Sequence, residues 1–253
     1  MRVLLIILFL LLTTTVVADS AGCPKYKRKS YRHWIDRDRD CQKARHEVLI
    51  AESISPVGFK TSKGCRVVSG SWNDPYSGKT IADATKLDID HMVPLKEAHE
   101  SGGHAWDVYR KRDYANDLSD PNTLIAVDRG LNRQKGAGDP AEWLPPNKAY
   151  QAEYAQAWVA VKLKWGLTAD AKEIEVLRTL LGADADLPIM AEECSGAINP
   201  LSAKLPVAEV DCSAKKYCKD MSICDEARVY LIQCGMKNLD RDGDGVPCEA
   251  LCD

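Results

Sequence analysis

The spacing of apolar side chains predicts where the longer helices lie. Between residues 148 and 165 the apolar positions recur every three to four residues, the period of a helix with one buried face; they are Tyr150, Tyr154, Trp158, Val161 and Trp165. A second helix is expected over Ala171 to Leu181, with Asp170 as its N-cap and Gly182 at its end. A third is expected over Arg45 to Ser53. The aromatic stripe of the first helix is predicted to be part of the core.

Shorter apolar segments predict strands between these helices. Cys65 to Val68 has strand composition and runs into a turn over residues 73–78, which contains Asn, Asp, Pro and Gly. Leu87 to His91 and Thr123 to Val127 also have the length and composition of strands. We therefore expect an α+β fold.

The first residues have the pattern of a secretory signal peptide. A basic start at Met1-Arg2 is followed by an apolar run from Val3 to Leu12 and by small residues that end at Ala18. The apolar run is shorter than the ~20 residues that cross a membrane, which argues against an anchor. We expect cleavage after Ala18, no membrane span in the mature chain, and a secreted or periplasmic location. No obligate protein partner is evident.

Composition and cysteine content describe an exported globular protein. The 253 residues are 45% apolar and 28% charged, which excludes a disordered or collagen-like chain. All ten cysteines follow the signal peptide, and an even number in an exported chain predicts disulfides. Six of them lie between Cys212 and Cys252, without a C-x-x-C pair, so disulfides are favoured over zinc there. We expect a small module fastened by bridges.

The distribution of charge along the chain supports a division into two domains. Loss of Arg2 changes the net charge from −3 to −4, and residues 207–253 carry ten acidic against six basic side chains, which accounts for all of it. A segment with proline and serine, residues 195–206, is the expected linker. The expected domains are therefore residues 19–194 and 207–253, after a signal peptide over residues 1–18.

The most informative residues for chemistry are Asp90 and His91 at the end of a predicted strand. Neighbouring strand residues point to opposite faces, so one can hold a metal while the other accepts a proton. A hard cation such as Mg²⁺ prefers oxygen ligands, and Asp90 and the amide of Asn132 offer them. Taken singly, such residues are more often turn or cap residues.

Together, Asp90-His91 with Pro94, then Asn122, then Asn132-Arg133 with Lys135, resemble the HNH, or ββα-metal, endonucleases. Residues 30–180 are similar to exported bacterial nucleases of this family, and the resemblance implies a strand–strand–helix core that cleaves DNA, or also RNA, with low sequence specificity. It implies His91 as general base, Asp90 and Asn132 as ligands of Mg²⁺ or another divalent cation, and Asn122 as a residue that fixes the loop or orients His91. It further implies that Arg133 and Lys135 contact substrate phosphate.

The C-terminal module contains an acidic loop, Asp240-Arg241-Asp242-Gly243-Asp244-Gly245, in which carboxylates at positions 1, 3 and 5 can converge on calcium. With Cys248-Glu249 it resembles the Excalibur module, an EF-hand-like calcium-binding domain. The resemblance implies Asp240, Asp242, Asp244 and Glu249 as Ca²⁺ ligands and a Cys212–Cys248 disulfide. The usual Glu at position 12 is replaced by Leu251, so weak affinity is expected.

Three points remain open at this level. A similar alternation, Asp36 to Asp40, is followed by Cys41 where glycine would be needed, and we expect a surface turn or a poor ion site. Cys41–Cys65 is the preferred bridge of the larger domain, which leaves Cys23 and Cys194 to join its ends. The alternative to an enzyme is a non-catalytic, calcium-dependent protein that binds a cell surface or nucleic acid.

Overall fold

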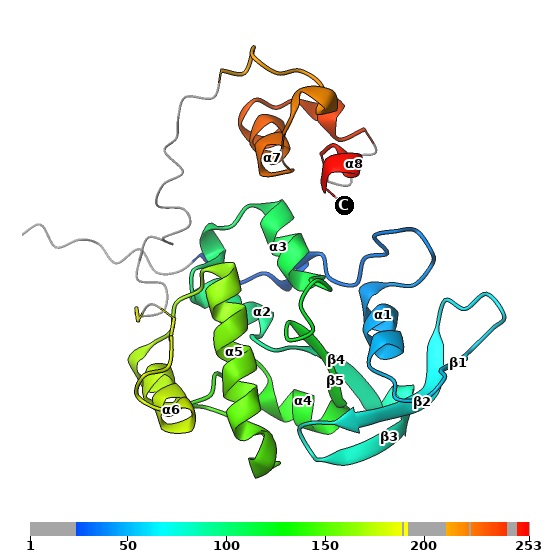
Figure 1. Cartoon of the computed structure of the whole chain (residues 1–253), viewed down its shortest axis with the longest axis vertical. Coiled ribbons are helices and arrows are strands. Elements are labelled where there is room, and N and C mark those ends of the chain that lie inside the picture. The colour runs from blue at the N-terminus through cyan, green and yellow to red at the C-terminus, as the bar shows by residue number, and fades with distance from the viewer. Residues whose placement is uncertain (1–23, 189, 192–210, 223, 242–246, 253) are drawn as a thin grey trace, which may run out of the picture.

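The computed structural model describes residues 24–188, 190–191, 211–222, 224–241 and 247–252 (Figure 1). Its helices are α1 (Ala44–Ala51), α2 (Leu95–Glu100), α3 (Val108–Ala115), α4 (Arg129–Lys135), α5 (Gln151–Trp165), α6 (Ala171–Leu181), α7 (Cys224–Gln233) and α8 (Glu249–Cys252). Its strands are β1 (Gly58–Phe59), β2 (Val67–Asp74), β3 (Lys79–Asp83), β4 (Leu87–His91) and β5 (Leu124–Asp128). The signal peptide, the linker, Cys23 and Cys194 lie outside the described residues.

The strands form two antiparallel sheets, one in the order β1-β2-β3 and one of β4 and β5. Asp74 builds the turn after β2, because its carboxylate accepts the backbone N–H groups of Tyr76 at 3.2 Å and Ser77 at 3.0 Å. Gly78 then takes φ 70°, a conformation open to glycine without steric cost. Asp74 also accepts the N–H of Asp128 at 3.1 Å, so one carboxylate joins the two sheets.

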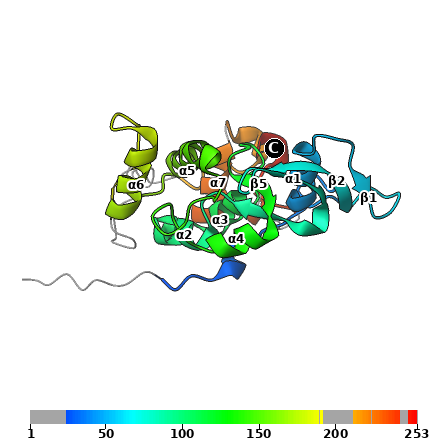
Figure 2. The same ribbon diagram turned by 90° about the horizontal axis from the view of Figure 1, so that it is seen from below.

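The β4–β5 sheet lies between two apolar cores. Leu124 and Ala126 of β5 pack with side chains of α1 and β2, whereas Ile125 and Val127 pack with side chains of α2, α3, α5 and α6. This alternation is the period of two expected for a strand buried on both faces. Figure 2 shows the resulting arrangement from below, with α6 and β1 at opposite ends.

The structure confirms the predicted long helices and the strands β4 and β5, whereas the strand predicted over Cys65 to Val68 corresponds to β2, which begins at Val67 and extends to Asp74. α6 and β4 have the predicted bounds, α1, α5 and β5 lie within a few residues of theirs, and Tyr154 and Trp158 are fully buried as expected for core positions. Mixed helices and small sheets agree with the expected class at this coarse level. The apolar pattern did not predict β1, β3, α2 or α3; the two helices have only six and eight residues, too few to show a clear apolar period.

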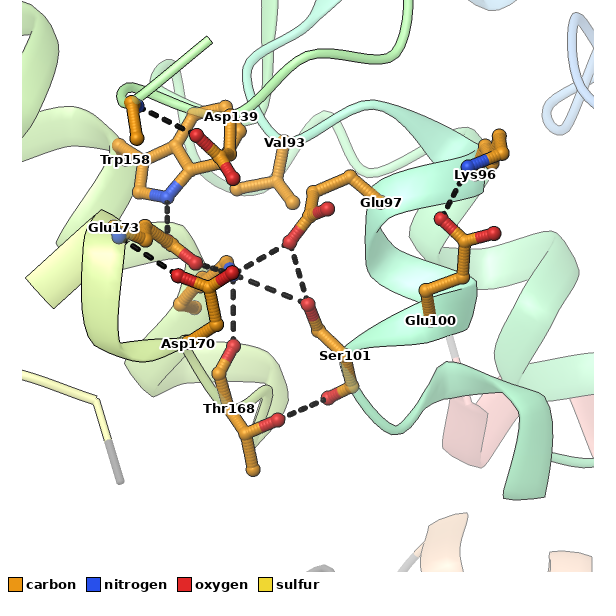
Figure 3. Close-up of polar contacts among 12 residues, drawn as sticks. Val93, Lys96, Glu97, Glu100, Ser101, Asp139, Trp158, Thr168, Asp170 and Glu173 are labelled. Atoms are coloured by element: carbon orange, nitrogen blue, oxygen red, sulfur yellow. Dashed lines mark hydrogen bonds and ion pairs between the residues drawn. The ribbon is translucent and has the colours of Figure 1, made fainter. Parts of the chain in front are cut away.

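A buried ion-pair network ties α5 to α2 and α6 (Figure 3). The Lys162 amine is fully buried and donates to Glu97 at 2.7 Å, Glu173 at 2.7 Å, the carbonyl of Thr168 at 2.7 Å and the hydroxyl of Ser101 at 3.1 Å. Burial raises the pKa of Glu173 to about 7 although Lys162 pulls in the other direction. The network therefore positions three helices around one cation.

The C-terminal module is a small helical unit held by disulfides, with Met221, Tyr230 and Leu239 in its own apolar cluster. The described bridges are Cys212–Cys234 and Cys218–Cys248, so the expected Cys212–Cys248 bridge is wrong. The backbone N–H of Cys248 donates to the carbonyl of Leu239 at 2.7 Å, and the sulfur of Cys218 lies 3.9 Å from that same carbonyl oxygen. Six cysteines permit fifteen pairings, and spacing alone could not select this one.

The larger domain has the expected bridge between Cys41 and Cys65, which joins the segment before α1 to the segment before β2. Within the part of the chain that the structure describes, no helix is both long and apolar enough to cross a membrane.

Candidate functional site

The candidate site lies where β4 ends, beside β5 and α4. β4 and β5 pair in regular antiparallel register over their whole length. The chain leaves β5 at Asp128, whose carboxylate accepts two N–H groups of the first turn of α4 at 2.8 and 2.9 Å. This cap starts α4, which packs against both strands. The segments that carry the Asp90-His91 pair and Asn132 therefore form one strand–strand–helix unit.

Asp90 is held inside the protein by two donors. Its residue is only 5% exposed, and Oδ2 accepts hydrogen bonds from the Tyr76 hydroxyl and the Lys135 amine, each at 2.5 Å. Burial raises the pKa of Asp90 and lowers that of Lys135, each against the attraction of the partner. Among the contacts of the described residues, both bonds use Oδ2. Oδ1 is thus the oxygen of this carboxylate that remains for a further ligand.

The position of Lys135 does not fit the expected phosphate contact. Its side chain is fully buried, and besides Asp90 its amine donates to the carbonyls of His91 at 3.0 Å and Met92 at 2.7 Å. The rings of Tyr76, Tyr154 and Trp158 surround the ammonium at 5.6 to 5.8 Å. Lys135 is an internal anchor that fastens α4 to the end of β4.

His91 lies on the other face of β4. Its residue is 6% exposed, and Nε2 lies 3.0 Å from the carbonyl oxygen of Ala115. Because a carbonyl only accepts, Nε2 carries the proton, and Nδ1 keeps the lone pair. Burial lowers the pKa of His91 to about 3; the bond to Ala115 opposes this shift, and the positive charges of Arg28, His33 and Lys135 add to it. The imidazole is therefore neutral at neutral pH, with Nδ1 as its proton acceptor.

The segment before α1 covers the His91 side of the site. Asn116, at the end of α3, accepts the backbone N–H of Ile35 at 3.0 Å and donates to the carbonyl of Arg32 at 3.0 Å. These bonds hold the segment so that the ring of Trp34 lies 5.6 Å from the ring of His91. The segment that contains Trp34 thus lies against the candidate site.

The other predicted residues of the site are placed as follows. Asn122 donates its side-chain amide to Asp120 at 3.0 Å, which fits a role in fixing the loop before β5. Asn132 is half-buried and lies one helical turn before Lys135, so both residues share a face of α4. Arg133 is exposed on the same helix. The structure brings the segments of Asp90, His91 and Asn132 together, and Asn122 lies two residues before Leu124, the residue of β5 that pairs with His91.

The expected calcium ligands of the C-terminal module are described only in part. Asp242 and Asp244 lie outside the described residues. Asp240 is half-buried, and Glu249 is an exposed residue in the first turn of α8, 3.6 Å from the guanidinium of Arg39. Their roles as ligands remain predictions.

Sequence reasoning missed two side chains of the site, Tyr76 and Trp34. Tyr76 lies in the recognised turn after β2, but only the pairing of β2 with β3 and the position of the turn bring its hydroxyl to Asp90. A signal for the buried position of Lys135 was present: Leu131 lies four residues earlier and packs against the core, so Lys135 falls on the inner face of α4.

Comparisons with known proteins agree with this division of the chain. The family model described as "GmrSD restriction endonucleases, C-terminal domain" matches residues 44–180, and the "Excalibur calcium-binding domain" matches residues 215–249. An "Uncharacterized secreted protein" of Arthroderma benhamiae is 36% identical over 156 residues, which cover 62% of this chain and 74% of that protein. No solved structure matches.

The first match spans more than half of the chain and contains both strands and the helix of the candidate site. The second spans most of the disulfide-bonded module. The chain therefore belongs to the family of GmrSD restriction endonuclease C-terminal domains, and it carries a calcium-binding Excalibur domain behind that nuclease-type domain.

Proposed function

We propose that the protein is a secreted, divalent-metal-dependent endonuclease that hydrolyses phosphodiester bonds of DNA with little sequence preference. The observation that carries this proposal is the geometry at the end of β4: the His91 imidazole, fixed through Nε2 by the Ala115 carbonyl, directly follows the Asp90 carboxylate in one strand–strand–helix unit. In this proposal β4, β5 and α4 are the ββα-metal core of an HNH nuclease. Membership in a restriction-endonuclease domain family supports phosphodiester cleavage. The disulfides and the relative described as secreted support an extracellular location.

His91 would act as the general base. Nδ1 takes a proton from the water that attacks phosphorus, and the resulting imidazolium keeps its Nε2–H bond to the Ala115 carbonyl, whose partial negative charge stabilises it. That bond also fixes the ring during the proton transfer. A positioned general base contributes about 10²- to 10⁴-fold when its pKa lies near the working pH, and the low pKa of buried His91 places its contribution toward the lower end of that range.

The donor set beside His91 fits a hard cation in kind, because a carboxylate and an amide oxygen are ligands that Mg²⁺ accepts. Asp90, through Oδ1, and Asn132 would hold it. When bound, the cation neutralises charge that develops on the phosphate oxygens. Lys135 and Tyr76 hold Oδ2 of the same carboxylate and so fix its orientation.

Substrate phosphates would be met by exposed cations around this unit. Arg133 is exposed on α4, and Lys25, Lys27, Arg28 and Lys29 are exposed on the segment that covers His91. Such contacts neutralise phosphates regardless of base sequence and make affinity fall with salt. This charge distribution supports a substrate with a long phosphate backbone.

A plasmid-nicking assay tests the proposal. Full-length oxidised protein is incubated with supercoiled plasmid and Mg²⁺, and initial rates are compared for the wild type, His91→Ala and the control His104→Ala, which lies in the short 3-10 helix Gly103–Ala105 that follows α2. We expect His91→Ala to lower the rate by about 10²-fold or more. His104→Ala should stay near wild type, and chelator should stop nicking.

Two results would contradict the proposal. A folded His91→Ala protein that nicks at the wild-type rate removes the assigned base, and nicking in excess chelator removes the metal. Tight plasmid binding without cleavage by the wild type would favour the non-catalytic binding protein instead. Repeating the assay with RNA establishes the substrate class.

A further inference from the structure

A second acidic loop lies in the nuclease-type domain, directly before α1. Asp36, Asp38 and Asp40 each place a carboxylate oxygen within 4.8 Å of the other two. Three carboxylates at this separation repel one another, and the repulsion grows where solvent is partly excluded. Asp36 is the most buried of the three.

One of these oxygens lacks the donor that burial requires. Oδ1 of Asp36 is shielded from solvent and has no hydrogen-bond partner among the described residues, while Oδ2 accepts the backbone N–H of Cys41 at 3.0 Å. A buried carboxylate oxygen without a partner costs free energy, and a cation that binds it removes the cost. The unpaired atom belongs to the first residue of the loop.

A fourth carboxylate, that of Glu47, lies near this group of three without belonging to it. Glu47 is half-buried in the first turn of α1, eleven residues after Asp36. Burial raises the pKa of Glu47, and the negative charges of Asp38, Asp40 and Asp36 raise it further. The helix therefore presents an acidic group within the electrostatic range of all three aspartates.

Counted from Asp36, these residues occupy the ligand positions of a twelve-residue calcium loop. Such a loop takes carboxylates from positions 1, 3 and 5, a backbone carbonyl from position 7 and a glutamate from position 12. Position 7 is Gln42, whose carbonyl accepts no backbone hydrogen bond from the described residues. Position 12 is Glu47.

Position 6, normally glycine, is Cys41. Its φ is 76°, the left-handed conformation that glycine usually provides there, and its disulfide to Cys65 holds the loop at this point. The missing glycine is thus replaced by a strained cysteine, which explains why the sequence pattern alone indicates only a turn or a poor ion site.

The arginines between the aspartates have partners elsewhere. Arg37 bonds Asp113 of α3 at 2.8 Å, and Arg39 lies 3.6 Å from Glu249 of α8. The loop thus keeps its acidic character although it contains two basic residues.

We propose that residues 36–47 form a calcium-binding loop of the nuclease-type domain, separate from the Excalibur domain and from the candidate active site, with Asp36, Asp38, Asp40 and Glu47 as side-chain ligands. At the start of α1, the backbone N–H of Ala44 donates to the carbonyl of Ile35 at 2.9 Å, so the loop holds this end of the helix next to the segment that carries Trp34.

Calcium titration of the full-length oxidised chain tests this site. Stoichiometry is measured by calorimetry in excess Mg²⁺ for Asp38→Asn, Glu47→Gln and the control Glu153→Gln, an exposed glutamate of α5. We expect Asp38→Asn and Glu47→Gln each to bind one Ca²⁺ per chain fewer than the control. Asp240→Asn assigns the remaining event to the Excalibur domain. Terbium gives a second readout, because emission sensitised by Trp34, two residues before the loop, should disappear in the same two variants.

Asp38 is exposed, so its substitution should leave the fold intact, and an unchanged thermal transition in chelator verifies this. The proposal is overturned if folded Asp38→Asn and Glu47→Gln proteins bind as many Ca²⁺ ions as Glu153→Gln. It is also overturned if Asp240→Asn alone removes all calcium binding.

Discussion

Replacing Lys135 by methionine tests whether this residue anchors the core or contacts substrate. Methionine has similar length and no charge, so the substitution removes the ammonium from four acceptors: the Asp90 carboxylate, the Tyr76 hydroxyl and the carbonyls of His91 and Met92. Because the two side chains have similar length, the substitution leaves only a small cavity in the core. After the substitution, Asp90 is still a residue with 5% exposure, and the Tyr76 hydroxyl is the one donor that its carboxylate keeps among the described residues.

The magnitude follows from burial. Removing one partner of a buried ion pair costs about 3–5 kcal/mol, because the other charge stays inside without compensation. The two orphaned carbonyls add to that cost. A surface pair has a much smaller effect, at most about 1 kcal/mol. Lys164 provides a control that is closer to this case: its side chain is 33% exposed, and its partner Asp117, which is 2.7 Å away and 6% exposed, keeps the hydroxyls of Ser119 and Thr123 as donors.

Urea unfolding monitored by tryptophan fluorescence measures the difference in the nuclease-type domain alone, since all six tryptophans lie between residues 34 and 165. We expect Lys135→Met to lower the free energy of unfolding by about 3 kcal/mol or more, and Lys164→Met by less than about 1 kcal/mol. Equal, small losses of unfolding free energy in both variants would refute the role of Lys135 as an internal anchor. A stable Lys135→Met protein whose DNA binding depends less on salt would instead support the phosphate contact that the resemblance implied for Lys135.

Two further predictions concern the nuclease-type domain. Burial raises the pKa of Glu52 to about 7, so the folded state keeps a proton that the unfolded state releases near 4.5; stability from this group is complete below pH 4.5 and is lost as pH rises through 7. Glu52→Gln should therefore flatten the urea-measured pH dependence and stabilise the protein at pH 8 by up to about 3 kcal/mol, and an unchanged slope would contradict this. The Cys41→Ser/Cys65→Ser variant opens a crosslink of 24 residues and should lose about 3.5 kcal/mol in urea unfolding; a loss below about 1 kcal/mol would show that the unfolded chain is hardly constrained by it.

Sequence patterns predicted those elements whose period repeats often enough to be read. α5 and α6 extend over three turns or more, and β4 and β5 are continuous apolar runs between turn residues. The alternation within β4 also predicted that Asp90 and His91 point to opposite faces, and the structure places them against α4 and against Trp34 respectively. Local periodicity was sufficient for these features because each is decided by residues close in sequence.

Partners that are distant in sequence could not be read in this way. Tyr76 bonds Asp90 across fourteen residues, Ala115 bonds His91 across twenty-four, and Lys135 bonds Asp90 across forty-five. Each contact depends on how the two sheets and α4 pack, which no single segment specifies. The Cys212–Cys248 pairing expected in the C-terminal module was wrong for the same reason, because disulfide partners are also distant in sequence.

The position of Lys135 links the stability of the domain to the geometry of its site. The ammonium bonds the Asp90 carboxylate and the carbonyls of the next two residues, so it fixes the end of β4 relative to α4. Asn132 lies one turn earlier on that helix, and its distance from Asp90 is therefore set by the same contact. Because a hard cation needs both oxygens at defined distances, a charge that no substrate can reach determines whether the two proposed ligands act together. The burial of Lys135 is thus what allows a short, seven-residue helix to position the proposed ligand Asn132 for the chemistry proposed at His91.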